Sequence, residues 1–155
     1  MDRQADDFEA DGRGDSKRGM QMIGIDTNVL VRFIVQDEPK QSKIATKLIE
    51  TSLSATNKGF ISSVVLCEVV WVLKRLYRQP KDRLLLVVKT ILEAEVFEVE
   101  HRDCAWRAYY DFDEGSADFS NYYLARINKT CGASFTVTFD ERAQKHRLFK
   151  PPTIG

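Results

Sequence analysis

Four carboxylic acids and one amide are the residues whose types and spacing could do chemistry. Asp26 and Asp140 each end an apolar stretch that is typical of a β-strand. Glu68 lies within an apolar stretch that predicts a helix, and Asp118 and Asn121 are three residues apart near the start of another predicted helix. A spacing of three places the last two on one helix face.

A group of carboxylates without histidine or thiolate partners indicates a site for a hard divalent cation. The chain has two histidines, and its three cysteines form no CxxC pair, so histidine- and thiolate-based metal sites lack ligands. Mg²⁺ and Mn²⁺ prefer oxygen ligands and complete their coordination with water and phosphate oxygens. Such an ion can position water and a scissile phosphate, so the chemistry we predict is phosphodiester hydrolysis.

Each acid also has a purely structural interpretation. Asp26 and Asp140 are suitable caps for helices that follow them, and a helix dipole stabilises an acid at the position of Asp118. A carboxylate buried in an apolar helix costs several kcal/mol unless it is paired or binds a metal. We therefore expect Glu68 either to bind the ion or to pair with a nearby arginine, of which the candidates are Arg32 and Arg75.

The elements that position these residues alternate between strands and helices. Such alternation is typical of the α/β class, with a mostly parallel sheet, here of four to five strands, covered by helices on both faces. Ligands collect at the carboxyl ends of such strands, so Asp26 and Asp140 share one crevice if their strands are neighbours. The predicted strands are 22–26, 59–62, 96–100 and 132–140, and the predicted helices are 28–35, 39–53, 64–77, 80–94, 102–112 and 115–127.

Two of these helices have predicted start signals. Pro39 suits a first turn that Asp37 or Glu38 caps, and Ser62 or Ser63 suits the cap of the helix that contains Glu68. The helix that begins at Pro39 should run for about four turns. Its apolar face is predicted to contain Ile44, Ala45, Leu48, Ile49 and Leu53.

Length and composition predict one globular domain at 22–155. A chain of 155 residues that is 43% hydrophobic can bury one core. Residues 1–21 are polar and charged, so we expect a disordered tail or a cloning remnant there. Three scattered cysteines favour a reducing, cytoplasmic location, and no apolar run reaches the roughly 18 residues of a membrane span.

A basic stretch at 74–83 is the candidate surface for nucleic acid. Lys74, Arg75 and Arg78 can contact phosphates, and Tyr77 can stack on an unpaired base, as in proteins that hold single-stranded RNA. The alternative is a solvated helix end whose cations answer the helix dipole. The formal net charge of the chain is zero, which by itself does not indicate nucleic-acid binding.

Four segments of the chain together resemble a known family. In order, they are "IDTNVLVRF", "FISSVVLCEVVWVLKRLY", "GSADFSNYYLARI" and "TVTFD". Their order and spacing are similar to those of PIN-domain ribonucleases, and most of all to the VapC toxins of bacterial toxin-antitoxin pairs. The resemblance covers about 22–150.

This resemblance implies a three-layer α/β/α sandwich that cuts RNA with Mg²⁺ or Mn²⁺. It also implies a homodimer and a cognate antitoxin, for which the apolar surplus of the helices at 64–73 and 84–92 offers a subunit interface or a groove. The side chains of Thr27 and Asn28 would support the first metal ligand, Asp26, from behind. The metal ligands that the resemblance implies are Asp26, Glu68, Asn121 and Asp140, with Asp118 beside them in the catalytic group.

Asn121 departs from the pattern of the family, which commonly has an acid at this position. An amide offers one carbonyl oxygen but no charge, so we interpret Asn121 as an inactivating substitution or as a natural variant in which Asp118 takes over. One alternative function is a catalytically impaired PIN fold that binds RNA or a partner. Another is a phosphatase of the haloacid dehalogenase type, which needs an aspartate where this chain has Asn28.

Overall fold

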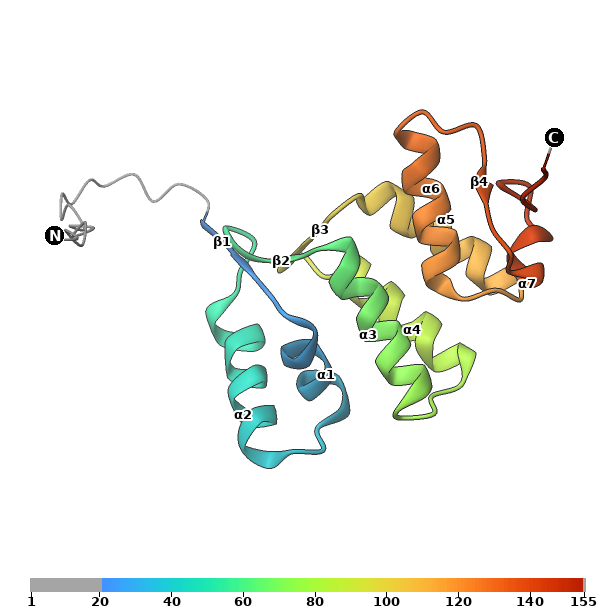
Figure 1. Cartoon of the computed structure of the whole chain (residues 1–155). Coiled ribbons are helices and arrows are strands. Elements are labelled where there is room, and N and C mark those ends of the chain that lie inside the picture. The colour runs from blue at the N-terminus through green and yellow to red at the C-terminus, as the bar shows by residue number, and fades with distance from the viewer. Residues whose placement is uncertain (1–20, 155) are drawn as a thin grey trace, which may run out of the picture.

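A sheet of three parallel strands is the largest sheet of the protein. The computed structural model describes residues 21–154, and the strands of this sheet are β1 (Gln21–Gly24), β2 (Asn57–Ile61) and β3 (Phe97–Val99). Their order is β1-β2-β3, so β2 is paired on both edges (Figure 1). The α/β class with parallel strands is therefore confirmed.

The predicted extent of this sheet was wrong. The strand before Asp140, β4 (Thr136–Val137), forms a separate parallel pair with β5 (Phe149–Lys150). The amide of Thr136 donates to the carbonyl of Leu148 at 2.8 Å. The partner of β4 is therefore β5, a strand that the sequence did not predict, and not β1. The central sheet thus has three strands instead of four to five.

Helices account for most of the remaining chain. Only Gln21 of the predicted N-terminal tail is described, and it begins β1; residues 1–20 lie outside the described part. The single domain at 22–155 stays a prediction. The helices are α1 (Thr27–Val35), α2 (Pro39–Lys47), the π-helix η1 (Leu48–Ser52), α3 (Ser63–Arg75), α4 (Lys81–Glu93), α5 (Arg102–Glu114), α6 (Phe119–Thr130) and α7 (Glu141–Gln144).

Side-chain caps begin α2 and α3 as the sequence predicts. The carboxylate of Glu38 accepts the amide hydrogen of Gln41 at 2.6 Å, and the hydroxyl of Ser62 accepts that of Val65 at 3.2 Å. The predicted burial of Ile44 was wrong, because its exposed fraction is 70%. Ala45 is buried as predicted, together with the small Ser42, and the predicted fourth turn is the wider π-helix η1.

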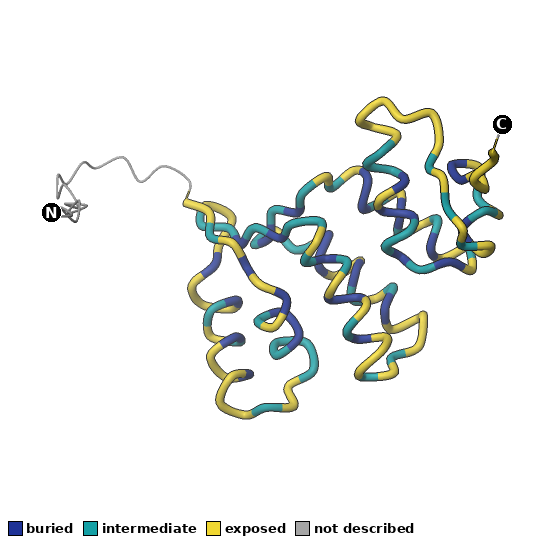
Figure 2. Tube along the Cα trace, in the orientation of Figure 1, coloured by how far each residue is buried: buried dark blue, intermediate teal, exposed yellow. Residues whose placement is uncertain are grey.

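The core runs along the inner faces of the helices and the central strand (Figure 2). Apolar residues three or four apart form these faces, as expected for amphipathic helices. Helix α3 has β-branched residues of modest helix propensity, so tertiary packing stabilises it. The buried residues of α3, α4 and α6 are Leu66, Val69, Val70 and Leu73; Leu84, Val88, Ile91 and Leu92; and Phe119, Tyr122, Tyr123 and Ala125.

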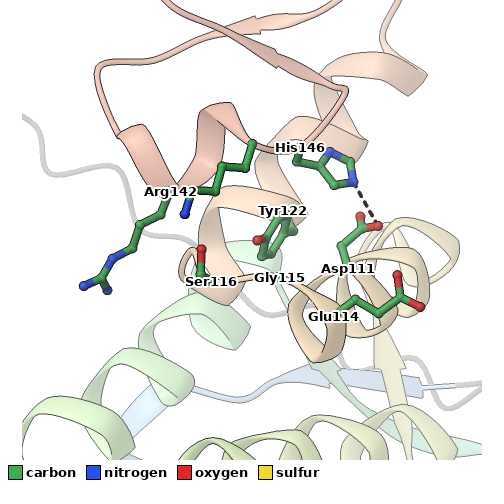
Figure 3. A pocket seen from close by; sticks show the side chains of 8 residues that line it. Asp111, Glu114, Gly115, Ser116, Tyr122, Arg142 and His146 are labelled. Atoms are coloured by element: carbon green, nitrogen blue, oxygen red, sulfur yellow. Dashed lines mark hydrogen bonds and ion pairs between the residues drawn. The ribbon is translucent and has the colours of Figure 1, made fainter.

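An ionic cluster fastens the C-terminal segment to α5 and α6. Arg126 donates two hydrogen bonds of 2.7 Å to the carboxylate of Asp111. His146 accepts the amide hydrogen of Leu148 at Nδ1, so its Nε2 carries the hydrogen that it donates to Asp111 at 3.1 Å (Figure 3). Burial acts to raise the pKa of Asp111, but the bonds from Arg126 and the contact with His146 outweigh it, and the pKa lies below its usual value.

Replacing Asp111 should therefore destabilise the fold. We expect Asp111→Asn to lower the free energy of unfolding at pH 7 by about 3 kcal/mol, because Arg126 would be left without its partner charge. Asp113→Asn, on the exposed side of the same helix, should change it by less than about 0.5 kcal/mol. Urea denaturation of the three proteins measures both differences, and equal values for Asp111→Asn and wild type would contradict the assignment.

The destabilisation caused by Asp111→Asn should disappear at acidic pH. The pKa of Asp111 is lowered in the folded state, so its contribution is complete above the unfolded-state pKa of about 3.9. The contribution is then lost as the pH falls through the lower folded-state value. The stability gap between wild type and Asp111→Asn should narrow below about pH 4, which a series of urea titrations between pH 2.5 and pH 7 tests.

Candidate active site

The first two predicted acids lie beside Thr27, at the carboxyl ends of β1 and β2. Asp26 caps α1 by accepting the amide hydrogen of Thr27 at 2.7 Å. The hydroxyl of the buried Thr27 donates to Oε2 of Glu68 on α3 at 2.5 Å. Because β1 and β2 are paired neighbours, the helices that follow them start side by side, and this places Asp26, Thr27 and Glu68 together.

The predicted burial of Glu68 was wrong. Its side chain is exposed, so the carboxylate avoids the cost of leaving water and needs no arginine partner. Arg32 instead donates to Gln41, Asp37 and Tyr77. The charge of Glu68 therefore does not require a metal ion, and its carboxylate faces solvent beside Thr27.

The side chains of Thr27 and Asn28 make other contacts than those predicted for them. Thr27 holds Glu68, whereas the sequence predicted support for the first metal ligand. Asn28 is exposed and, within residues 21–154, its side chain makes no hydrogen bond. It lines a cavity of about 230 Å³ between α1 and α2 together with Val29 and Arg32.

Asp118 and Asn121 lie at the start of α6, as predicted. The carboxylate of Asp118 does not cap the helix but forms an ion pair with Lys74 on α3. The backbone amide of Asn121 donates to the carbonyl of Asp118 at 3.0 Å, and the Asn121 side chain is half-buried. Lys74, which the sequence predicted to bind RNA phosphates, thus neutralises one of the predicted acids. Because the two residues are far apart in the chain, no local sequence pattern indicates this ion pair.

Asp140 lies apart from the other acids. Its Oδ1 caps α7 by accepting the amide hydrogens of Arg142 at 2.9 Å and Ala143 at 3.2 Å. Its strand, β4, belongs to the separate two-stranded sheet, at the opposite end of the molecule from β1 (Figure 1). The capping interpretation of Asp26 and Asp140 is confirmed, and the condition for a shared crevice, that their strands are neighbours, is not met.

The acids of one chain do not fit a divalent ion in this arrangement. Across residues 21–154, no group of three or more histidine, cysteine, aspartate and glutamate side chains lies close enough to hold a metal ion. Mg²⁺ and Mn²⁺ need convergent oxygen ligands, whereas the predicted ligands occupy three places: beside Thr27, beside Lys74 and at α7. The predicted ligands are residues of the right type, and the fold of one chain separates them.

Comparison with known proteins decides the family. The model of the PIN domain matches residues 23–147. The chain belongs to the PIN-domain family. It is also 28% identical over 121 residues to a protein described as VapC ribonuclease from Aquifex aeolicus (strain VF5), which covers 78% of this chain and 89% of that protein. The resemblance of the four sequence segments to VapC-like PIN domains is thereby confirmed.

Of the four residues of the basic stretch that were predicted to bind RNA, two cations remain available to a ligand in this PIN domain. The hydroxyl of Tyr77 donates to Asp37 at 2.7 Å and accepts a bond from Arg32 at 3.2 Å. The ring packs against the core, so the predicted stacking of Tyr77 on a base is disfavoured. Hydrogen bonding to Tyr77 is also the main cause that lowers the pKa of Asp37 and raises that of Arg32. Arg75 and Arg78 are exposed and form no ion pair within the described chain.

Two further cavities have none of the predicted acids in their linings. One of about 390 Å³ is bordered by charged residues that include Glu114, Arg142 and Lys145, with Tyr122 at its floor (Figure 3). The other, of about 360 Å³, is almost wholly apolar and lies between α1, η1, α4 and β3, where Phe33 and Ile91 contribute to its wall. None of the helices between residues 21 and 154 has the length and apolar character of a membrane span.

The bond between Thr27 and Glu68 should be measurable as a coupling energy. We expect Thr27→Val and Glu68→Ala each to destabilise the PIN domain modestly, and the double variant to lose less than their sum by about 1 kcal/mol. Thr27→Ser keeps the hydroxyl and should retain the coupling. Chemical denaturation of the four proteins of the cycle measures it, and strictly additive losses would show that this hydrogen bond does not stabilise the fold.

Proposed function

We propose that this protein is a metal-dependent ribonuclease and the toxin of a toxin-antitoxin pair. The observation that carries the proposal is the similarity to a VapC ribonuclease over most of both chains. The contact of Thr27 with Glu68 supports it, because it places the first two acid motifs side by side where a parallel sheet collects ligands. We propose RNA as the substrate and the cytoplasm as the location.

We propose Mg²⁺ or Mn²⁺ as the cofactor, because the predicted ligands all offer oxygen. They are Asp26, Glu68, Asn121 and Asp140, with Asp118 beside them. Their separation within one chain means that a complete centre requires a rearrangement or a second chain. The residues of this chain can meanwhile contribute fixed charges: exposed carboxylates at Asp26 and Glu68, and exposed guanidinium groups at Arg75 and Arg78 that attract phosphate.

An antitoxin is the proposed protein partner. The apolar cavity beside α1 and α4 is open to solvent and is lined by side chains such as Phe33, Ile34 and Leu86, of which Leu86 is 52% exposed. Apolar surface of this kind suits the apolar face of an amphipathic partner helix. We also propose a homodimer.

A second candidate function is a PIN domain that binds RNA or a partner without cutting RNA. Two observations favour it. Asn121 contributes no charge to the acid group, and Lys74 already neutralises Asp118. A protein with this function would bind RNA through Arg75 and Arg78 yet would show no cleavage when Mn²⁺ is added.

Restoring an acid at position 121 distinguishes the two functions. We expect Asn121→Asp to raise Mn²⁺-dependent cleavage of a pool of structured RNAs by at least about tenfold, since changes around metal ligands commonly alter activity by roughly 10- to 100-fold. Both proteins are purified free of antitoxin. Cleavage should stop when a chelator is added and when Glu68→Gln is introduced into the Asn121→Asp protein.

The outcomes separate the proposals clearly. Chelator-sensitive cleavage by Asn121→Asp that is lost with Glu68→Gln supports the ribonuclease. Binding of the same RNAs without cleavage by either protein, with Mn²⁺ present, contradicts it and favours the binding function. Cleavage that survives both the chelator and Glu68→Gln would reveal a contaminating nuclease.

The exposed arginines should make RNA binding dependent on salt. We expect Arg75→Ala and Arg78→Ala each to weaken binding of single-stranded RNA about equally for different sequences. Each lost phosphate contact should reduce the slope of the logarithm of the binding constant against that of the salt concentration by about 0.7. Fluorescence anisotropy at several salt concentrations measures the slope. Lys129→Ala, at the exposed end of α6, is the control that should leave it unchanged.

A further inference from the structure

The cavity of about 390 Å³ is formed by α5, α6, α7 and the loop that joins α5 to α6 (Figure 3). Its volume is within the range of pockets that bury small organic ligands, roughly 300 to 1,000 Å³. Side chains that can carry a charge reach it from both α5 and α7. None of the acids proposed for the metal site lines it, so the proposed function gives this cavity no role.

Contacts inside the chain hold the walls of this cavity in place. Lys81 on α4 donates to the carbonyls of Asp113 at 3.2 Å and Gly115 at 2.7 Å, and thereby fastens the loop between α5 and α6. Gly115 packs so closely on Tyr122 that an added Cβ would overlap the hydroxyl oxygen. The ionic cluster of Asp111 fastens the segment that follows α7. The cavity is therefore largely formed before a ligand arrives, as is usual for small-molecule sites.

Tyr122 has an unused hydrogen-bond donor at the floor of the cavity. The residue is 2% exposed, and its hydroxyl oxygen accepts the amide hydrogen of Ala117 at 3.1 Å. The hydroxyl hydrogen has no acceptor among the described residues. A buried donor without an acceptor costs free energy. Because Tyr122 lines the cavity, a ligand that places an oxygen there would satisfy this donor.

Two cations line the cavity from the C-terminal segment. Arg142 on α7 and Lys145, three residues later, are exposed and form no ion pair with another residue of the described chain. Asp111 does not cancel their charge, because Arg126 already neutralises its carboxylate. A guanidinium group offers paired donors that match phosphate oxygens, and an ammonium group adds a compact charge. This side of the cavity therefore suits a phosphate group.

Glu114 supplies a hydrogen-bond acceptor on the other side of the cavity. Figure 3 shows Glu114 and Arg142 on opposite sides of Tyr122. The carboxylate of Glu114 is exposed, and between residues 21 and 154 it has neither an ion pair nor a hydrogen bond. A carboxylate that accepts hydrogen bonds from sugar hydroxyls is a common way to hold ribose. A phosphate at one end and hydroxyl groups at the other are the chemistry of a ribonucleotide.

We propose that this cavity binds a ribonucleotide through its 5′-monophosphate. The phosphate contacts Arg142, Lys145 and the hydroxyl of Tyr122, and the ribose hydroxyls donate to Glu114. The same phosphate and ribose are offered by a free ribonucleoside 5′-monophosphate and by the 5′-phosphorylated end of an RNA. The inference does not rest on the proposed function, because the acids of that function lie elsewhere.

Calorimetric titration of the full wild-type chain with adenosine 5′-monophosphate tests the site. A chelator is present, so that no divalent ion bridges the ligand to other acids. We expect one saturable site per chain with a dissociation constant below about 1 mM. Inorganic phosphate, measured by competition, should bind at least about tenfold more weakly, because it cannot reach Glu114. No saturable binding of the nucleotide, or equal affinities for the two probes, would overturn the inference.

Two arginine variants separate the phosphate contact from general electrostatics. We expect Arg142→Ala to weaken binding of adenosine 5′-monophosphate by at least about tenfold. Arg147→Ala removes the same charge from the same exposed segment but outside the lining of the cavity, and it should change the affinity by less than about twofold because solvent screens it. Urea denaturation checks that both variants keep the stability of the wild type. Equal weakening by the two variants would indicate a nonspecific cationic surface and would overturn the site.

Glu114→Ala tests the ribose contact. It should weaken binding of adenosine 5′-monophosphate by at least about fivefold, because the sugar hydroxyls lose their acceptor. Binding of inorganic phosphate should stay the same or become tighter, since a negative charge is removed from the cavity. A purely structural role of Glu114 would weaken both ligands together, and that result would contradict the assignment of a ribonucleotide.

Two RNA probes distinguish a free nucleotide from an RNA end. A short RNA with a 5′-phosphate is compared with the same RNA with a 5′-hydroxyl group, again with chelator present. Tighter binding of the phosphorylated RNA that Arg142→Ala abolishes identifies an RNA end as the ligand. Binding of adenosine 5′-monophosphate without any effect of the RNA 5′-phosphate identifies a free nucleotide. Failure of all these probes overturns the inference and leaves the ribonuclease proposal intact, because that proposal depends on acids outside this cavity.

Discussion

The double pairing of β2 is the constraint on which the arrangement of this PIN domain depends. Its backbone groups bond to β1 on one edge and β3 on the other, and Gly59 lets neighbouring side chains approach closely. A Cβ at Gly59 would lie 2.8 Å from Cγ1 of Ile25 and 3.0 Å from Cδ1 of Leu53. Any larger residue would therefore push apart the start of α1, the end of η1 and the central strand. The register of β1 with β2 in turn sets where α1 and α3 begin, and thereby makes Thr27 a neighbour of Glu68.

Acids at the ends of strands come together only if the strands are neighbours in a sheet. The order of the strands therefore determines which acids of this chain lie close to one another. Thr27, which follows Asp26 in the chain, contacts Glu68 because β1 and β2 are adjacent. Asp140 does not join them, because β5 pairs with β4 and the ionic cluster around Asp111 fastens this pair to α5 and α6. The separation of the acids is thus a consequence of hydrogen bonding and ion pairing at the C-terminal end, and not of unsuitable residue types.

Features encoded within a few residues could be predicted from the sequence, and features that depend on distant segments could not. The caps at Glu38 and Ser62 require only the next three residues, so both were correct. The four quoted segments were enough to indicate the PIN family, which the match to residues 23–147 confirms. The exposure of Glu68 depends on how α3 lies against α1, and the pairing of β4 depends on β5, which is only two residues long. Neither leaves a periodic or compositional signal near the residue concerned.

Two features reduce the negative charge near the start of α6: the ion pair of Lys74 with Asp118 and the uncharged side chain of Asn121. The first is reversible, whereas the second is fixed by the sequence. The ion pair of Lys74 with Asp118 is half-exposed, with exposed side-chain fractions of 42% and 45%, and pairs of this kind contribute at most about 1 kcal/mol. A divalent cation, which has twice the charge of an ammonium group and binds oxygen directly, can displace Lys74 from Asp118 at little cost. The charge absent at Asn121 cannot be supplied by any movement of the chain, because an amide does not ionise. Restoring a negative charge at position 121 therefore requires a different side chain, whereas Asp118 needs only to separate from Lys74.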